Sequence, residues 1–194
     1  MITTTNTILL DGLVDPANDA VWREFDDRYR PVIEAFAVKL GLRPEDAADA
    51  AQETMVQFAR DYRAGRYDRE RGRLRSWIFG IARHRVLDAQ RARARRRERR
   101  GESALSDVQG SDDFERIWDD QWRKALLRTA LDELRAGPRL EPRTLRAFEL
   151  VALRGVAAAE AAREIGMSID EIYVAKSRVL KRLRQIVSEL EQNW

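Results

Sequence analysis

The sequence predicts an all-α protein: two small helical domains joined by a flexible linker. Apolar residues recur at steps of three and four along most of the chain, which is the period of a helix with one buried face. No stretch alternates apolar and polar residues as a half-buried strand does, and no internal repeat is evident. Residues 101–113, rich in Gly, Ser and Asp, interrupt the helical pattern and favour a linker there.

The composition excludes several classes of function. The chain has 194 residues, of which 44% are hydrophobic, enough for one ordinary domain or two small ones. It has no cysteine and a single histidine, His84, which excludes disulfides and thiolate metal sites. No phosphate-binding loop or nucleophile motif is present. We therefore expect no enzymatic activity, cofactor or metal, and the lack of a membrane-length apolar run indicates a cytoplasmic protein without membrane insertion.

Charges are strongly separated along the chain, although the net charge is only +3. Residues 83–100 hold nine arginines against Asp88 and Glu98, a local charge of +7. Residues 101–121 hold seven acids and one arginine, a local charge of −6. Such separation indicates distinct surfaces for distinct partners.

The first expected domain, residues 17–98, begins with a helical segment that Pro31 should divide into two pieces, because proline suits the first turn of a helix. Gly41 should end this segment, and Pro44 with the acids after it should start the next helix. The expected apolar stripes are Trp22, Phe25, Tyr29, Val32 or Ile33, Phe36 and Leu40, then Ala47, Ala51, Met55, Phe58 and Tyr62.

The second of these helices also has an acidic face. Asp46, Asp49 and Glu53 are spaced to lie together, away from the apolar stripe, with Gln52 beside them. The face is either an ordinary solvated surface or a surface that docks on another protein. Nothing marks these carboxylates as an acid–base pair in an apolar pocket.

A third helix should follow a loop at residues 63–73. Its apolar residues, Trp77, Ile78 and Ile81, are expected mainly in the core, and the helix continues into the arginine run. Arginines on a rigid helix neutralise phosphates, and aromatic side chains beside them can stack on unpaired bases. The apolar stripe thus fixes the helix on its domain and presents the cations from a firm surface.

Residues 157–185 predict a helix-turn-helix. Ala161 and Ala162 allow a second helix to cross closely, and Gly166 can end the first helix in a left-handed conformation. Ser168 or Asp170 can cap the second helix. Polar residues at its start followed by cations are what a recognition helix needs in a major groove, although a simple helical hairpin with a basic face has the same pattern.

Three motifs, in this order, resemble extracytoplasmic-function (ECF) sigma factors of bacterial RNA polymerase. The stretches "DAADAAQETMVQFAR" and "LRSWIFGIARHRVLDAQRARARR" are similar to two conserved helices of that family, and "IYVAKSRVLKRLR" is similar to its recognition helix. The resemblance covers residues 20–190 approximately. Ala48 stands where the family motif has glutamate, and His84 where it usually has asparagine.

The resemblance implies a transcription initiation factor. Sigma region 2, at residues 17–98, would bind the beta-prime clamp helices of core RNA polymerase and melt the minus-10 promoter element. Sigma region 4, at 117–192, would read the minus-35 element and contact the beta flap. Residues 99–116 would be an acidic linker and 1–16 an N-terminal extension without an assigned role. An anti-sigma factor or a regulatory kinase is a further possible partner.

The resemblance also implies three sets of site residues. The polymerase-binding set is Asp46, Asp49, Gln52 and Glu53. The minus-10 DNA-binding set is Arg75, Trp77, Arg83, His84, Arg85, Asp88 and Arg91, with loop 63–73 helping to hold a flipped base. The minus-35 DNA-binding set is Ser168, Asp170, Glu171, Tyr173, Lys176, Ser177, Arg178 and Lys181.

Two other functions fit parts of the sequence. A stand-alone helix-turn-helix regulator would bind specific duplex DNA tightly without polymerase. An RNA-binding protein would owe its affinity to the basic arm at residues 91–100 and would not need the helix-turn-helix. A sigma factor, in contrast, needs the polymerase to set the spacing of its two DNA-reading domains.

Overall fold

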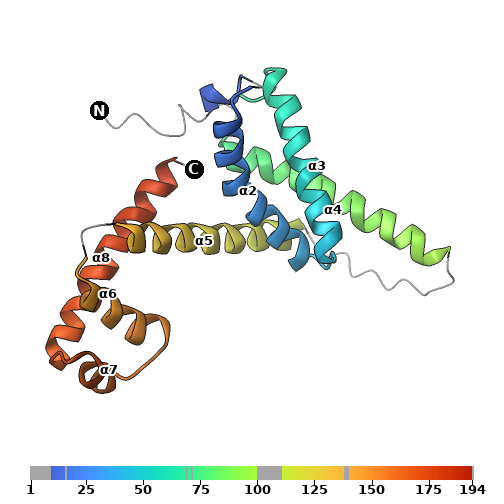
Figure 1. Ribbon diagram of the computed structural model, residues 1–194. Helices are drawn as coiled ribbons and strands as arrows, with labels where there is room; N and C mark the ends of the chain where they lie inside the picture. Colours follow the sequence, from blue (N-terminus) through green and yellow to red (C-terminus); the bar gives the residue numbers. More distant parts are fainter. Residues whose placement is uncertain are drawn as a thin grey trace. The chain divides into compact units, whose positions relative to one another are not determined.

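The computed structural model describes residues 10–15, 17–68, 70, 72–99, 111–137 and 140–193 (Figure 1). Within these ranges every regular element is a helix, which confirms the all-α prediction. None of the helices described is both long and apolar enough to cross a membrane. The expected N-terminal extension and acidic linker lie mostly outside the described residues.

Contacts divide the chain into two compact units, Met1–Ala125 and Leu126–Asn193. The first unit contains α2 (Asp19–Lys39), α3 (Pro44–Arg63) and α4 (Leu74–Glu98). The division falls inside α5 (Ser111–Ala136), so that the first half of this helix packs with the first unit. The resemblance implies a second domain from residue 117 onward, whereas Trp118 and Trp122 make ring contacts with residues of the first unit.

Helix α2 runs unbroken through Pro31, which corrects the expectation of two separate pieces. A proline inside a helix removes one backbone hydrogen bond and crowds the preceding turn. Both Pro31 and Asp27, the residue four positions earlier, are exposed, so water can satisfy the freed carbonyl. Buried Tyr29, Val32 and Ile33 on the opposite side hold the helix against the core.

Aromatic side chains form the centre of the first unit. Phe25 of α2 stacks on Phe58 of α3 with ring centroids 4.4 Å apart, and Phe58 contacts Trp77 of α4 at 5.3 Å. Phe25 and Phe58 are fully buried, together with Ile78 and Val86 of α4. The spacing of these residues places one apolar face of each helix toward the other two.

The ends of the helices fix how α2, α3 and α4 meet. Gly41 adopts φ +86°, a left-handed conformation that lets the chain turn at the end of α2, and Pro44 starts α3 as expected. Helix α4 donates back to this turn: Gln90 Nε2 lies 2.7 Å from the Leu40 carbonyl oxygen, and Arg93 Nη1 lies 2.8 Å from that of Gly41. The beginning of the basic arm is therefore attached to the first unit.

The second unit is built on the helix-turn-helix (Figure 1). Its elements after α5 are α6 (Pro142–Phe148), the π-helical turn η1 (Glu149–Leu153), α7 (Ala158–Ile165) and α8 (Ile169–Asn193). Ala161 and Ala162 of α7 are buried against Ile172 and Ala175 of α8, because small residues let the two helices approach closely. Gly166 has φ +71° and ends α7, which confirms the predicted turn.

Candidate nucleic-acid and protein interfaces

Three of the four residues in the predicted polymerase-binding set lie together on α3. Asp49, Gln52 and Glu53 are exposed and line an open hollow of about 470 Å³ on the side of α3 opposite its buried stripe. Val56, which is 52% exposed, adds an apolar surface to the same hollow. Asp46 is partly exposed one turn earlier and does not line it. This combination of acidic, amide and apolar groups suits contact with a basic protein surface.

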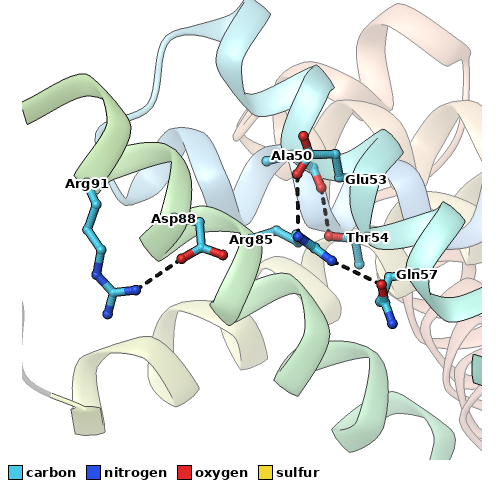
Figure 2. Close-up of polar contacts among 7 residues, drawn as sticks. All are labelled: Ala50, Glu53, Thr54, Gln57, Arg85, Asp88 and Arg91. Atoms are coloured by element: carbon cyan, nitrogen blue, oxygen red, sulfur yellow. Dashed lines mark hydrogen bonds and ion pairs between the residues drawn. The ribbon is translucent and has the colours of Figure 1, made fainter. Parts of the chain in front are cut away.

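Arg85 of α4 reaches into this acidic hollow. Figure 2 shows its guanidinium between Glu53 and Gln57 of α3, where Nη2 donates to Gln57 Oε1 at 3.1 Å. Nη1 lies 3.8 Å from Glu53 Oε2. The sequence assigns Arg85 to the minus-10 set, whereas in the structure it orients two side chains of the α3 face.

Three further members of the minus-10 set line a second hollow along α4. Trp77, which is partly buried, and the exposed His84 and Asp88 line this open hollow of about 370 Å³, together with Gln57, Gly80, Ile81 and Arg85. Arg91 follows one turn later and pairs with Asp88 at 3.0 Å, as Figure 2 shows. Both partners are exposed, and such pairs contribute little to stability, so Arg91 remains available to a phosphate.

Arg75 and Arg83 lie on a different side of α4, against the first half of α5. Arg75 pairs with Asp119, and its guanidinium carbon lies 4.8 Å from the ring centroid of Trp122. Arg83 lies in the same way over Phe114, at 5.4 Å. The structure therefore does not bring the seven residues of the predicted minus-10 set onto one surface.

The loop between α3 and α4 forms a small hollow beside Trp77. It measures about 320 Å³, and its described lining includes Tyr67, Asp68, Arg73 and Ser76. The ring of Tyr67 stacks on Trp77 with centroids 5.1 Å apart. A flat ring can occupy such a site by stacking, which is how proteins hold a base taken out of a duplex.

Asp61 holds the start of this loop and was not singled out from the sequence. Its side chain is almost buried and accepts from Arg66 Nη1 at 2.7 Å and from Gln57 Nε2 at 2.8 Å. Tyr67 was also not assigned individually. The stretch "RYDRER" has no periodicity that would distinguish one aromatic residue in a loop from any other, so only the fold reveals its place on Trp77.

The predicted minus-35 residues lie on α8 or at its start. Asp170, Tyr173, Ser177 and Lys181 recur at steps of three and four and are all exposed on one face, with the Tyr173 side chain 56% exposed. Arg178 is exposed beside this face, and Lys176 is partly buried at the edge of the core. Arg184 extends the same face by one turn and is also exposed, although it was not assigned from the sequence.

Ser168 and Glu171 form a reciprocal cap at the start of α8. The Glu171 carboxylate accepts from the Ser168 backbone amide at 2.7 Å, and the Glu171 amide donates to Ser168 Oγ at 3.2 Å. This is the capping-box arrangement of Ser and Glu at a spacing of three. Both side chains are therefore used to start the helix, which confirms Ser168 as the cap and gives the pair a structural task at the predicted DNA surface.

The cap predicts an effect of Ser168→Ala on both stability and titration. The bond from the Ser168 amide, followed by that with its side chain, lowers the pKa of Glu171. A lowered pKa in the folded state means that the stabilisation is present above the unfolded-state pKa and is lost as the pH falls through the folded value. We expect Ser168→Ala to destabilise the second unit by about 1 kcal/mol and to raise the pKa of Glu171.

Carbon-detected NMR titration of the Glu171 carboxyl in the full chain measures this shift. Ser177→Ala, which removes an exposed hydroxyl from the same helix outside the cap, is the control and should leave the Glu171 titration as in the parent. Because alanine keeps the backbone amide that bonds Glu171, an unchanged Glu171 titration together with an unchanged unfolding free energy in Ser168→Ala would contradict the cap.

Arg143 of α6 holds the turn between α7 and α8. Its Nη2 donates to the carbonyl oxygens of Ile165 at 3.1 Å and Gly166 at 2.7 Å, two groups left over at the end of α7. A second arginine of α6, Arg146, pairs with Glu164 at 2.8 Å. We refer to the contacts of Arg143 with Ile165 and Gly166 as the Arg143 clamp. It cannot be predicted from the sequence, because no local pattern indicates a contact between residues about twenty positions apart.

Comparison with known proteins finds sequence similarity over most of the chain. Residues 25–96, which contain the α3 and α4 surfaces, match the family model "Sigma-70 region 2". The chain is 28% identical over 181 residues to the ECF RNA polymerase sigma factor RpoE of Cereibacter sphaeroides, covering 93% of both chains. A solved structure of CnrH in complex with the cytosolic domain of CnrY aligns with 95% of this chain and 97% of its own, at 17% identity and a TM-score of 0.39.

The match to region 2 and the nearly full-length similarity to RpoE extend over the residues that carry the three motifs. Residues 25–96 therefore match sigma-70 region 2, and the chain is similar to an ECF sigma factor over nearly its whole length.

Proposed function

We propose that the chain binds core RNA polymerase through the acidic face of α3 and directs it to specific promoters. The first unit melts the minus-10 element along α4 and the adjoining loop, and α8 of the second unit reads the minus-35 element. Core RNA polymerase is the partner that similarity to sigma factors implies. The finer roles, including contacts with the beta-prime clamp helices and the beta flap, follow the resemblance of the motifs.

One observation supports this proposal most strongly. The acidic hollow on α3 and the aromatic hollow on α4 are adjacent, and both are lined by Gln57 and Arg85. A protein-docking surface beside a base-stacking surface suits a factor that opens DNA while held on another protein. A stand-alone DNA-binding regulator has no need of this arrangement.

Run-off transcription tests the proposed function directly. Core RNA polymerase is supplied with a genomic promoter library, with and without the chain, and the transcripts are sequenced. We expect new start sites that share two spaced sequence elements. Unchanged start-site selection would contradict the proposal, and tight sequence-specific binding to duplex DNA in the absence of polymerase would favour the stand-alone regulator.

Replacement of a basic residue on α8 should alter the salt dependence of promoter binding. Arg178→Ala or Lys181→Ala in the polymerase complex is expected to reduce the slope of log affinity against log salt by about one unit if the side chain contacts a phosphate. If Arg178 instead pairs with guanine, the loss is about 1–3 kcal/mol and is confined to one base position.

Arg128→Ala is the control for this experiment, because Arg128 is an exposed arginine on α5, away from the helix-turn-helix in the sequence. Electrophoretic mobility shifts over a series of salt concentrations measure the slope. Equal slopes and affinities for the parent protein and all three variants would remove Arg178 and Lys181 from the DNA-binding surface.

A further inference from the structure

The first half of α5 covers an aromatic and basic strip of α4. Phe114, Trp118 and Trp122 of α5 are almost completely buried, at 3%, 2% and 4% exposure. Trp118 lies with its ring centroid 5.5 Å from Phe79 of α4 and 5.4 Å from Phe36 of α2. The contact therefore belongs to the core of the first unit, although α5 continues into the second.

The covered strip consists of Arg75, Phe79 and Arg83, spaced four residues apart on one side of α4. Each guanidinium lies over an aromatic ring of α5, as described above. Alternating cationic and aromatic side chains are the groups that bind single-stranded nucleic acid, since arginine pairs with phosphate and an aromatic ring stacks on a base. The aromatic rings of the first half of α5 thus take the places that DNA bases would occupy, and the Asp119 carboxylate takes the place of a phosphate.

The contact between the strip and α5 leaves polar groups on both sides unsatisfied. Arg75 Nε, Arg83 Nε and Trp118 Nε1 are buried and have no hydrogen-bond partner among the described residues. Buried donors without partners weaken a contact, because their bonds to water are lost without replacement. Aromatic packing holds the first half of α5 in place, whereas these three groups favour its exchange for a ligand that accepts hydrogen bonds.

We propose that Arg75, Phe79 and Arg83 form a binding strip for single-stranded DNA, which residues 113–125 of α5 cover in the free chain. Release of this segment gives both guanidinium groups access to phosphate oxygens and gives Phe79 access to a base. This inference rests on the proposed function, in which α4 meets melted DNA. It adds that the chain itself masks part of that surface until the DNA strand displaces α5.

Asp119→Asn tests the cover with little disturbance to the fold. It removes the carboxylate partner of Arg75, and the Asp119 side chain is 48% exposed. Asp120→Asn is the matched control: it makes the same change of charge one residue later, where the carboxylate pairs with Lys124 of the same helix at 2.6 Å. A general gain in DNA affinity from the lost negative charge will appear equally in both variants.

Binding of a fluorescent single-stranded oligonucleotide of mixed sequence to the full chain is measured over a range of salt concentrations, without polymerase. Each phosphate contact on a single strand contributes about 0.7 to the salt slope. We expect Asp119→Asn to steepen the slope by up to about 1.4 for two contacts and to bind more tightly than Asp120→Asn. Adding Arg83→Gln to Asp119→Asn should remove about half of that gain. Equal slopes for Asp119→Asn and Asp120→Asn would overturn the proposal.

Hydrogen exchange provides a second measurement that does not need a variant. Saturating the parent chain with the same oligonucleotide should accelerate amide exchange in residues 113–125 and leave α2 and α3 protected. Unchanged exchange in 113–125 under saturation would show that the segment stays in place, which contradicts the proposal. Failure of the chain to direct run-off transcription would contradict the proposed function alone, because neither of these measurements uses polymerase.

Discussion

The Asp49→Arg variant is expected to bind core RNA polymerase about 100-fold less tightly than the parent chain. Asp49 is exposed in the acidic hollow, so the substitution places a cation where the proposed partner surface is basic. Like charges brought together at an interface cost several kcal/mol, and each 1.4 kcal/mol is about tenfold in affinity. Fluorescence anisotropy of the labelled chain, titrated with core enzyme, measures the change.

Asp27→Arg is the control for Asp49→Arg. Asp27 is also an exposed aspartate of the first unit, but it lies on α2 and not on the acidic face. The two variants have the same net charge and should have the same helical circular dichroism. If both bind polymerase equally well, α3 is not the docking surface, and if both lose affinity equally, long-range attraction and not local contact explains the effect.

The largest expected effect on stability is that of Phe58→Ala. Phe58 is fully buried and contacts Phe25 of α2, Trp77 of α4 and Tyr62 of its own helix. Removing a buried phenylalanine side chain costs about 3–5 kcal/mol, because apolar burial is lost and a cavity remains. A loss of this size is a large part of the stability of a small domain. Urea unfolding followed by circular dichroism measures it.

Val56→Ala provides the comparison, since Val56 lies on the same helix and is 52% exposed. Its unfolding free energy should stay within about 0.5 kcal/mol of the parent value. Phe58→Ala should also increase the mobility of Trp77, because it removes the ring against which Trp77 packs. A Phe58→Ala protein as stable as Val56→Ala would mean that the aromatic centre does not hold the first unit together.

Much of the fold follows from local patterns in the sequence. The steps of three and four identify the helices, and Gly41, Pro44 and Gly166 mark their ends, because each glycine has the left-handed backbone that its turn requires. The capping pair Ser168 and Glu171 is likewise a pattern within four residues. Such features depend on neighbours along the chain, so the sequence contains the information needed to predict them.

The rest depends on packing between distant segments. Proline propensity predicts a break at Pro31, but tertiary burial on the opposite side of α2 keeps that helix continuous. The three faces of α4 also cannot be predicted from the sequence, because each is defined by what lies against it. Arg85 contacts α3, His84 faces solvent, and Arg83 contacts α5. The sequence thus identifies α4 as one helix with apolar and basic residues, but not which of its side chains face α3, solvent or α5.

If α8 reads the promoter as proposed, the Arg143 clamp has a consequence for engineering new promoter specificities. If α8 alone were exchanged between related proteins, the new α8 would still follow the recipient's own turn. Arg143 of α6 holds that turn through the carbonyl oxygens of Ile165 and Gly166. A transferred segment should therefore run from Pro142 to Asn193, because the orientation of α8 depends on Arg143, which precedes it in the sequence.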